Sequence, residues 1–77
     1  MTITEIEAFV EKKPFVPFSI NLNDGKSYPV THPEFIYIID RINKIILVSP
    51  SNTMYALIDT DFISSIISPA PADNTFR

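Results

Sequence analysis

The chain has 77 residues, of which 45% are hydrophobic and 19% are charged, and its formal net charge is −3 at pH 7. This length allows one domain at most, and the apolar fraction excludes a wholly disordered chain. The acidic balance disfavours a nucleic-acid partner, because nucleic-acid binders usually carry a basic surface. The sequence contains no cysteine, which excludes disulfides and cysteine-ligated metals.

A short helix is predicted over residues 4–13. Two overlapping Thr-x-x-Glu boxes in residues 2–7 are typical of a helix N-terminus. Ile6, Phe9 and Val10 then form an apolar stripe at helical spacing, and a proline follows the segment. Because a helix of about ten residues is not stable alone in water, the stripe is expected to pack on a sheet.

A β-hairpin is predicted in residues 14–35, which read PFVPFSINLNDGKSYPVTHPEF. Apolar and polar residues alternate along residues 18–23 with the two-residue period of a half-buried strand. A two-residue loop would place Tyr28 on the polar face of this strand. A three-residue loop, residues 23–25, instead pairs Ile20 with Tyr28 and keeps one face apolar, and we prefer it for that reason.

The preferred loop has further structural consequences. It pairs Phe18 with Val30, and it requires Gly25 to adopt a positive φ, which glycine does without steric cost. Pro29 cannot donate a hydrogen bond to a neighbouring strand, so it indicates that this strand lies at a sheet edge.

Four further strands are predicted, over residues 35–40, 44–49, 54–58 and 62–67, with a turn or single helical turn at residues 59–61. The first two of these strands are apolar on both faces. A sheet that forms one layer has only one side facing the core, so its other side also needs cover. The helix is expected to cover part of it, and a second copy of the chain the remainder, which predicts a homo-oligomer. The competing explanation is a barrel that curls tightly enough for the helix and residues 69–77 to suffice.

These elements predict a mainly β (α+β) fold, with a short N-terminal helix followed by a five- or six-stranded, strongly curved antiparallel sheet or a small Sm/SH3-like barrel. One domain is expected over residues 1–69. Residues 70–77 contain proline and alanine and are expected to form a disordered tail. The sequence has neither a bilayer-spanning segment nor a typical signal peptide, so we expect a cytoplasmic protein without a membrane partner.

Few residues are candidates for catalysis or metal binding. His32 with Glu34 could form an acid–base pair or bind a metal, but a catalytic zinc needs about three protein ligands. A local role of His32 in a turn is therefore preferred. Asp59 and Asp61 match no calcium-binding loop and are expected to be solvated turn residues. We predict no metal, no cofactor and no enzymatic activity.

The candidate binding residues are Phe15, Tyr55 and His32. Most aromatic side chains of the chain are explained by core packing, because they alternate with polar residues. Phe15 and Tyr55 fit the predicted core least well. The predicted function is a non-catalytic protein-interaction or oligomerisation module, with a protein partner as a further possibility. The alternatives are an Sm-like RNA or nucleotide binder and a small-ligand binding protein.

The run PFxPFxIxLxDGxxxxVxHPEF, residues 14–35, resembles a group of small bacterial proteins of unknown function. Those proteins also begin with a short helix and end in a strand rich in valine or isoleucine. The resemblance covers most of the chain and implies no activity.

The segment of residues 16–26 with the preceding helix also resembles the start of Sm-like proteins, particularly the bacterial RNA chaperone of that fold. Residues 62–67, followed by a proline, look like the last strand of that family and its exit. The resemblance implies a five-stranded barrel that assembles as a ring and binds RNA. The Lys-His pair of the family would fall near residues 59–61, where two acids stand instead, so the fold is implied more strongly than RNA binding.

Overall fold

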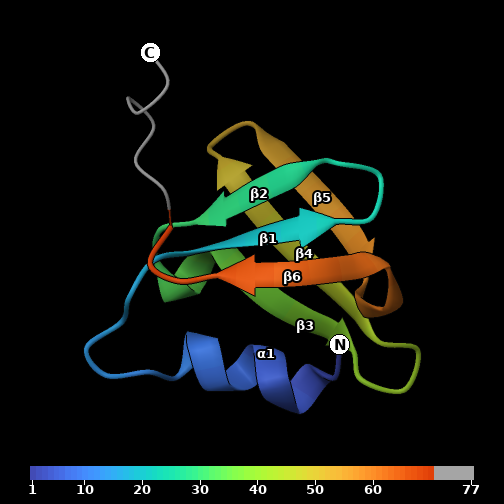
Figure 1. Cartoon of the computed structure of the whole chain (residues 1–77), viewed down its shortest axis with the longest axis horizontal. Helices are drawn as coiled ribbons and strands as arrows, with labels where there is room; N and C mark the ends of the chain where they lie inside the picture. Colours follow the sequence, from blue (N-terminus) through green and yellow to red (C-terminus); the bar gives the residue numbers. More distant parts are fainter. Residues whose placement is uncertain (71–77) are drawn as a thin grey trace.

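The computed structural model describes residues 1–70 as one short helix and six strands (Figure 1). The elements in chain order are α1 (Ile3–Val10), β1 (Phe18–Leu22), β2 (Ser27–Val30), the 3-10 turn η1 (Pro33–Phe35), β3 (Ile36–Asp40), β4 (Ile45–Ser51), β5 (Met54–Asp59), the 3-10 turn η2 (Thr60–Phe62) and β6 (Ile63–Ile67). The predicted mainly β fold with an N-terminal helix is confirmed. Each predicted strand is present, with its ends shifted by at most two residues.

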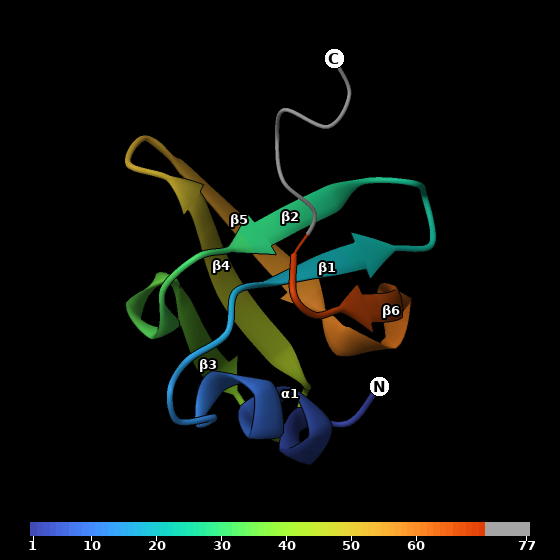
Figure 2. The ribbon, with the colours of Figure 1, turned by 60° about the vertical axis from the view of Figure 1, so that its left-hand side comes forward.

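The strands form two antiparallel sheets of three, which we call sheet A (β2-β1-β6) and sheet B (β3-β4-β5). Figures 1 and 2 show that the strands of sheet A cross over those of sheet B, with α1 along one open side. The predicted single, strongly curved sheet is therefore wrong, and so is the predicted closed Sm/SH3-like barrel. No strand of sheet A is hydrogen-bonded to a strand of sheet B in residues 1–70.

Two prolines give a physical reason for the separate sheets. The backbone N–H of Leu22 donates to the carbonyl of Lys26 at 2.8 Å. Hydrogen-bonded pairs recur at every second position, so Pro29, which lies opposite Ser19, directs its nitrogen to the free edge of β2. That edge lacks a donor there, as predicted for an edge strand. Pro33 then begins η1, which separates β2 from β3.

The predicted hairpin register is confirmed. Phe18 lies opposite Val30 and Ile20 lies opposite Tyr28. Gly25 has a φ of +92°, as the three-residue loop requires.

The helix begins earlier and ends earlier than the predicted range of residues 4–13. The first Thr-x-x-Glu box is the one used. The backbone N–H of Glu5 donates to Thr2 Oγ1 at 3.1 Å, and the backbone N–H of Thr2 donates to Glu5 Oε1 at 2.9 Å. This reciprocal cap starts α1 at Ile3, and the helix ends at Val10.

The early start changes which residues anchor α1. Ile3 and Ile6 are buried, whereas Phe9 is half-buried. The ring of Phe9 packs on Phe18 of β1, with 5.5 Å between ring centroids. The helix therefore covers one side of the core, as expected for a short helix whose stability depends on packing.

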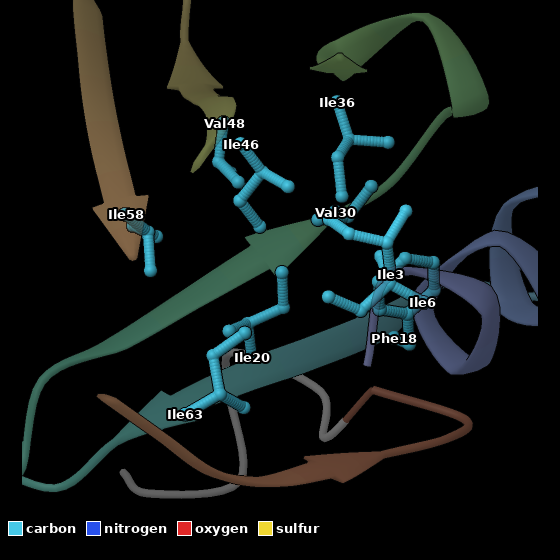
Figure 3. Close-up of a cluster of buried hydrophobic side chains, with 10 residues drawn as sticks. All are labelled: Ile3, Ile6, Phe18, Ile20, Val30, Ile36, Ile46, Val48, Ile58 and Ile63. Atoms are coloured by element: carbon cyan, nitrogen blue, oxygen red, sulfur yellow. The ribbon is translucent and has the colours of Figure 1, made fainter. Parts of the chain in front are cut away.

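The core lies between the inner faces of the two sheets and α1 (Figure 3). Its buried side chains are Ile3, Ile6, Phe18, Ile20, Val30, Ile36, Ile46, Val48, Ile58 and Ile63. In β1 and β3–β5 the core residues alternate with residues that face away from it, so each sheet also has an outer face.

Most of the predicted C-terminal tail, residues 70–77, lies beyond the part of the chain that the structure describes. Of the expected tail, residues 71–77 lie outside the described residues. The backbone N–H of Ala70 donates to the carbonyl of Pro17 at 2.9 Å. Within residues 1–70, α1 is too short to cross a membrane, and no other helix has the required length and apolar character.

Candidate interaction surface

The outer face of sheet A carries a connected set of polar side chains. Ser19 Oγ lies 2.8 Å from Ser27 Oγ, and Ser27 Oγ donates to Asn21 Oδ1 at 2.7 Å. Asn21 Nδ2 donates in turn to Ser65 Oγ at 3.2 Å. These hydroxyl and amide groups hydrogen-bond to one another across all three strands, so their polar atoms are satisfied without a partner.

The outer face of sheet B is apolar instead. Tyr37, Leu47 and Leu57 lie directly opposite one another on β3, β4 and β5. Tyr37 is 52% exposed and Leu57 is 69% exposed, so no element within residues 1–70 covers this row. We call the following set the outer apolar face: Tyr37, Ile39, Ile45, Leu47, Tyr55 and Leu57.

The strand sequences account for this face. Strand β3 is apolar at every position but its last, and β4 is apolar over residues 45–48, so the inner positions supply the core and the outer positions there remain apolar. In β5, Tyr55 and Leu57 alternate with the half-buried Ala56 and the buried Ile58. The prediction that these strands carry apolar side chains on both faces is thus confirmed by their burial, but the helix does not cover the outer face.

One end of the outer apolar face forms a hollow of about 250 Å³, which we call the aromatic pocket. It is lined by Glu34 and Phe35 from η1, Tyr37 from β3, Ser49 from β4, Asn52 from the β4–β5 turn and Tyr55 from β5. Ser49 Oγ donates to the carbonyl of Ser51 at 2.8 Å, which fixes the turn that carries Asn52.

The three binding residues predicted from the sequence lie in two places. Tyr55 is 69% exposed and lines the aromatic pocket. His32 is exposed, and its ring meets the ring of Phe35 edge-to-face, with 5.2 Å between centroids. Phe15 is half-buried and packs on Phe18 at 5.8 Å, as part of the shell around the core. The structure thus places Tyr55 at the pocket and His32 in contact with Phe35 but outside the pocket lining, whereas Phe15 packs against the core.

The sequence analysis singled out neither Tyr37 nor Leu57 as a binding residue. Both are more than half exposed on the outer apolar face. The signal that could have found them was already present in the doubly apolar strands. That pattern identifies a strand with two apolar faces but does not say which of them faces the core.

A second hollow, of about 600 Å³, lies between the β1–β2 hairpin and β5 with η2. Its lining combines apolar side chains with charged ones of both signs: Leu22, Asp24, Lys26, Tyr28, Ile45, Leu57, Ile58, Asp59 and Phe62. The ring of Phe62 is 60% exposed at this hollow.

The carboxyl groups whose pKa is lowered lie in a turn and in a helix cap. The backbone and side-chain N–H groups of Asn43, with a smaller contribution from the backbone of Ile42, hold the pKa of Asp40 below its ordinary value. Hydrogen bonds from Thr2 likewise lower the pKa of Glu5. Among residues 1–70 no group of three or more histidine or acidic side chains is arranged to hold a metal ion.

Comparisons of the chain with protein-family models, with curated proteins and with solved structures give no match in any of the three. The two resemblances noted from the sequence therefore stay predictions. The surface has to be interpreted from its own geometry.

Proposed function

We propose that the chain is a non-catalytic interaction module that self-associates through the outer apolar face of sheet B. The observation that carries this proposal is the row of Tyr37, Leu47 and Leu57, which crosses all three strands and faces water. The polar, internally hydrogen-bonded face of sheet A supports the choice of surface, because it lacks this apolar excess.

The exposed area supports an interface between two copies. Tyr37, Ile39, Tyr55 and Leu57 are between 52% and 69% exposed. With about 150–250 Å² for a fully exposed side chain of this size, they leave on the order of 500 Å² in water. This is at the upper end of the largest apolar patch on a typical monomer, about 300–600 Å². Paired face to face, two copies would bury roughly 1,000 Å², the lower limit of a specific interface.

A two-fold arrangement is the simplest closed solution, because the same patch then serves both copies. An interface at the lower size limit is expected to dissociate at concentrations on the order of micromolar. The assembly should therefore respond to dilution in an ordinary laboratory range.

Nucleic-acid binding fits the charges less well. Arg41 is engaged by Glu7 through two contacts of 2.8 Å, and Lys44 lies 3.4 Å from Asp61. The net charge is −3. A backbone-binding surface for RNA would need several basic side chains free to neutralise phosphates, and its affinity would fall with added salt.

The test is multi-angle light scattering across a tenfold dilution series, compared with the mass of one chain, 8.7 kDa. We expect a mass near twice this value at the highest concentration and a decline on dilution. The variant Leu57→Lys should remain at the single-chain mass, because it places a charge within the apolar row, on its β5 member.

Ile42→Lys is the matched control, since Ile42 is 89% exposed in the β3–β4 turn and is not part of the outer apolar face. It makes the same change of charge and should leave association unchanged. A single-chain mass of the wild type at every concentration would refute self-association. An equal effect of both variants would show that charge in general, and not this surface, controls association.

A further inference from the structure

The aromatic pocket has a composition that the proposed self-association does not require. Three aromatic rings, of Phe35, Tyr37 and Tyr55, reach it from η1, β3 and β5. The remaining lining consists of one carboxylate, Glu34, and two neutral polar side chains. The pocket therefore combines aromatic rings with a negative charge, and it is lined by no basic side chain.

We propose that the aromatic pocket binds the head group of a small quaternary ammonium compound of the choline class. The face of an aromatic ring is negative and attracts a cation that lies within about 6 Å of the ring centre. Quaternary ammonium groups are recognised by several aromatic rings together, because they cannot donate hydrogen bonds and lose little hydration on binding. Glu34 adds a full negative charge at the rim.

Among the described residues, the rings of Phe35, Tyr37 and Tyr55 do not stack on one another. Tyr37 and Tyr55 are more than half exposed, whereas Phe35 is half-buried. The ring of His32 contacts Phe35 edge-to-face, at 5.2 Å and 86°. Glu34 forms no ion pair within residues 1–70.

The size of the pocket limits the ligand. Its volume of about 250 Å³ lies below the range of about 300–1,000 Å³ that is typical of pockets for drug-sized ligands. A head group of one nitrogen and its methyl groups suits such a hollow better than an extended molecule does. The open side of the pocket leaves room for the remainder of a choline molecule in solvent.

The pocket shares Tyr37 and Tyr55 with the outer apolar face, so self-association would cover part of the pocket. Binding of a cation therefore has to be measured on a chain that does not associate. The variant Leu57→Lys is suited to this purpose, because Leu57 lies on the face but does not line the pocket. Binding is therefore tested both on the wild type and on Leu57→Lys. The ligand proposal does not depend on the proposed association, and either can fail alone.

The experiment is a titration of the ¹⁵N-labelled chain with choline chloride at constant ionic strength, followed by NMR. We expect saturable shifts of the backbone amides of Glu34, Phe35 and Tyr55, with a Kd on the order of a millimolar. The neutral isosteric alcohol, in which carbon replaces the quaternary nitrogen, should bind at least about fivefold more weakly, because it lacks the charge that the rings attract.

Variants locate the site. Tyr55→Ala should weaken choline binding about tenfold, whereas Tyr55→Phe keeps the ring and should retain it. Glu34→Gln should weaken binding a few-fold without abolishing it. Phe62→Ala is the matched control, because it removes a similarly exposed aromatic ring at the other hollow, and it should leave choline binding unchanged.

Three results would overturn the proposal. The first is the absence of saturable shifts in both the wild type and Leu57→Lys. The second is equal affinity for choline and its neutral isostere, which would make the pocket apolar and not cation-selective. The third is an unchanged affinity of Tyr55→Ala, which would place the ligand elsewhere on the chain.

Discussion

Gly25 allows backbone strain to be measured separately from side-chain packing. This residue has a φ of +92°, and a Cβ added there would meet no atom within 4 Å. A substitution therefore changes the energy of the backbone conformation without producing a clash. We expect Gly25→Ala and Gly25→Val to destabilise the chain through this conformation alone, with the β-branched side chain having the larger effect.

Two opposing contributions set the size of the effect. A left-handed backbone costs a residue with a Cβ roughly 1–2 kcal/mol in the folded state. Removal of a glycine also lowers the conformational entropy of the unfolded chain, which returns about 0.4–1 kcal/mol. The net loss of folding free energy is therefore about 1 kcal/mol, which corresponds to a fall in Tm of roughly 4–8 °C for a domain of this length.

Thermal unfolding followed by circular dichroism measures this difference. Gly25→Asn serves as the matched control, because asparagine visits left-handed conformations more readily than alanine or valine and should lose less stability. An unchanged Tm for Gly25→Val would refute the reasoning. It would mean that residues 23–25 do not hold position 25 at positive φ in solution.

The remaining predictions concern α1 and the β3–β4 turn. Ile6 is fully buried and Phe9 is half-buried. In urea unfolding, Ile6→Ala should therefore lower the free energy of unfolding by about 2–5 kcal/mol, and Phe9→Ala by less than the roughly 3–5 kcal/mol of a fully buried phenylalanine. A larger loss for Phe9→Ala would contradict the packing of α1. The N–H groups of Asn43 hold the pKa of Asp40 below its ordinary value. The stability that Asp40 contributes is thus present above its pKa in the unfolded chain and is lost as pH falls through its lower folded pKa. Titration of the Asp40 carboxyl by NMR should show this lowered pKa, Asn43→Ala should move it upward, and an ordinary pKa in the wild type would disprove the contact.

Local features of the chain were predictable from the sequence. The hairpin register followed from the alternation along β1 and from the single glycine, because only one loop length keeps Ile20 and Tyr28 on the same face. For the start of α1, the sequence offered two overlapping Thr-x-x-Glu capping boxes, which begin at Thr2 and Thr4. Both boxes satisfy the same local rule, and the choice of Thr2 depends on the burial of Ile3 against the core, which is a tertiary effect.

The relation between the two sheets was not predictable in the same way. Short antiparallel strands in sequence are compatible with a barrel, a curved sheet or two packed sheets. The outcome depends on whether the edge of β2 can bond another strand. Pro29 blocks that edge at one position, and Pro33 begins a turn where a barrel would need a continuous strand. The sequence indicated each proline as a strand edge or break, but not their joint effect on closure.

The candidate surface was only partly predictable for a similar reason. Tyr55 was found because it fitted the core poorly, whereas Tyr37 was missed because its strand is apolar at almost every position. Periodicity identifies a buried face only where the other face is polar. Phe15 shows the opposite limit, since it follows no regular strand pattern and yet packs on Phe18 at the margin of the core.

The two sheets differ in the side chains on their outer faces, and this difference shows which apolar residues the fold itself does not need. Both sheets bury apolar side chains on their inner faces, but sheet A places mainly serine and asparagine outside, with Ile67 and Pro29 at its margin, and sheet B places tyrosine, isoleucine and leucine there. A side chain such as Leu57, which is 69% exposed, contributes little to the core. Its replacement by lysine should therefore change the folding free energy of a single chain by no more than about 0.5 kcal/mol, as is usual for surface positions. If Leu57→Lys abolishes association at unchanged single-chain stability, the apolar excess of sheet B serves assembly; if it unfolds the chain, the outer face belongs to the core.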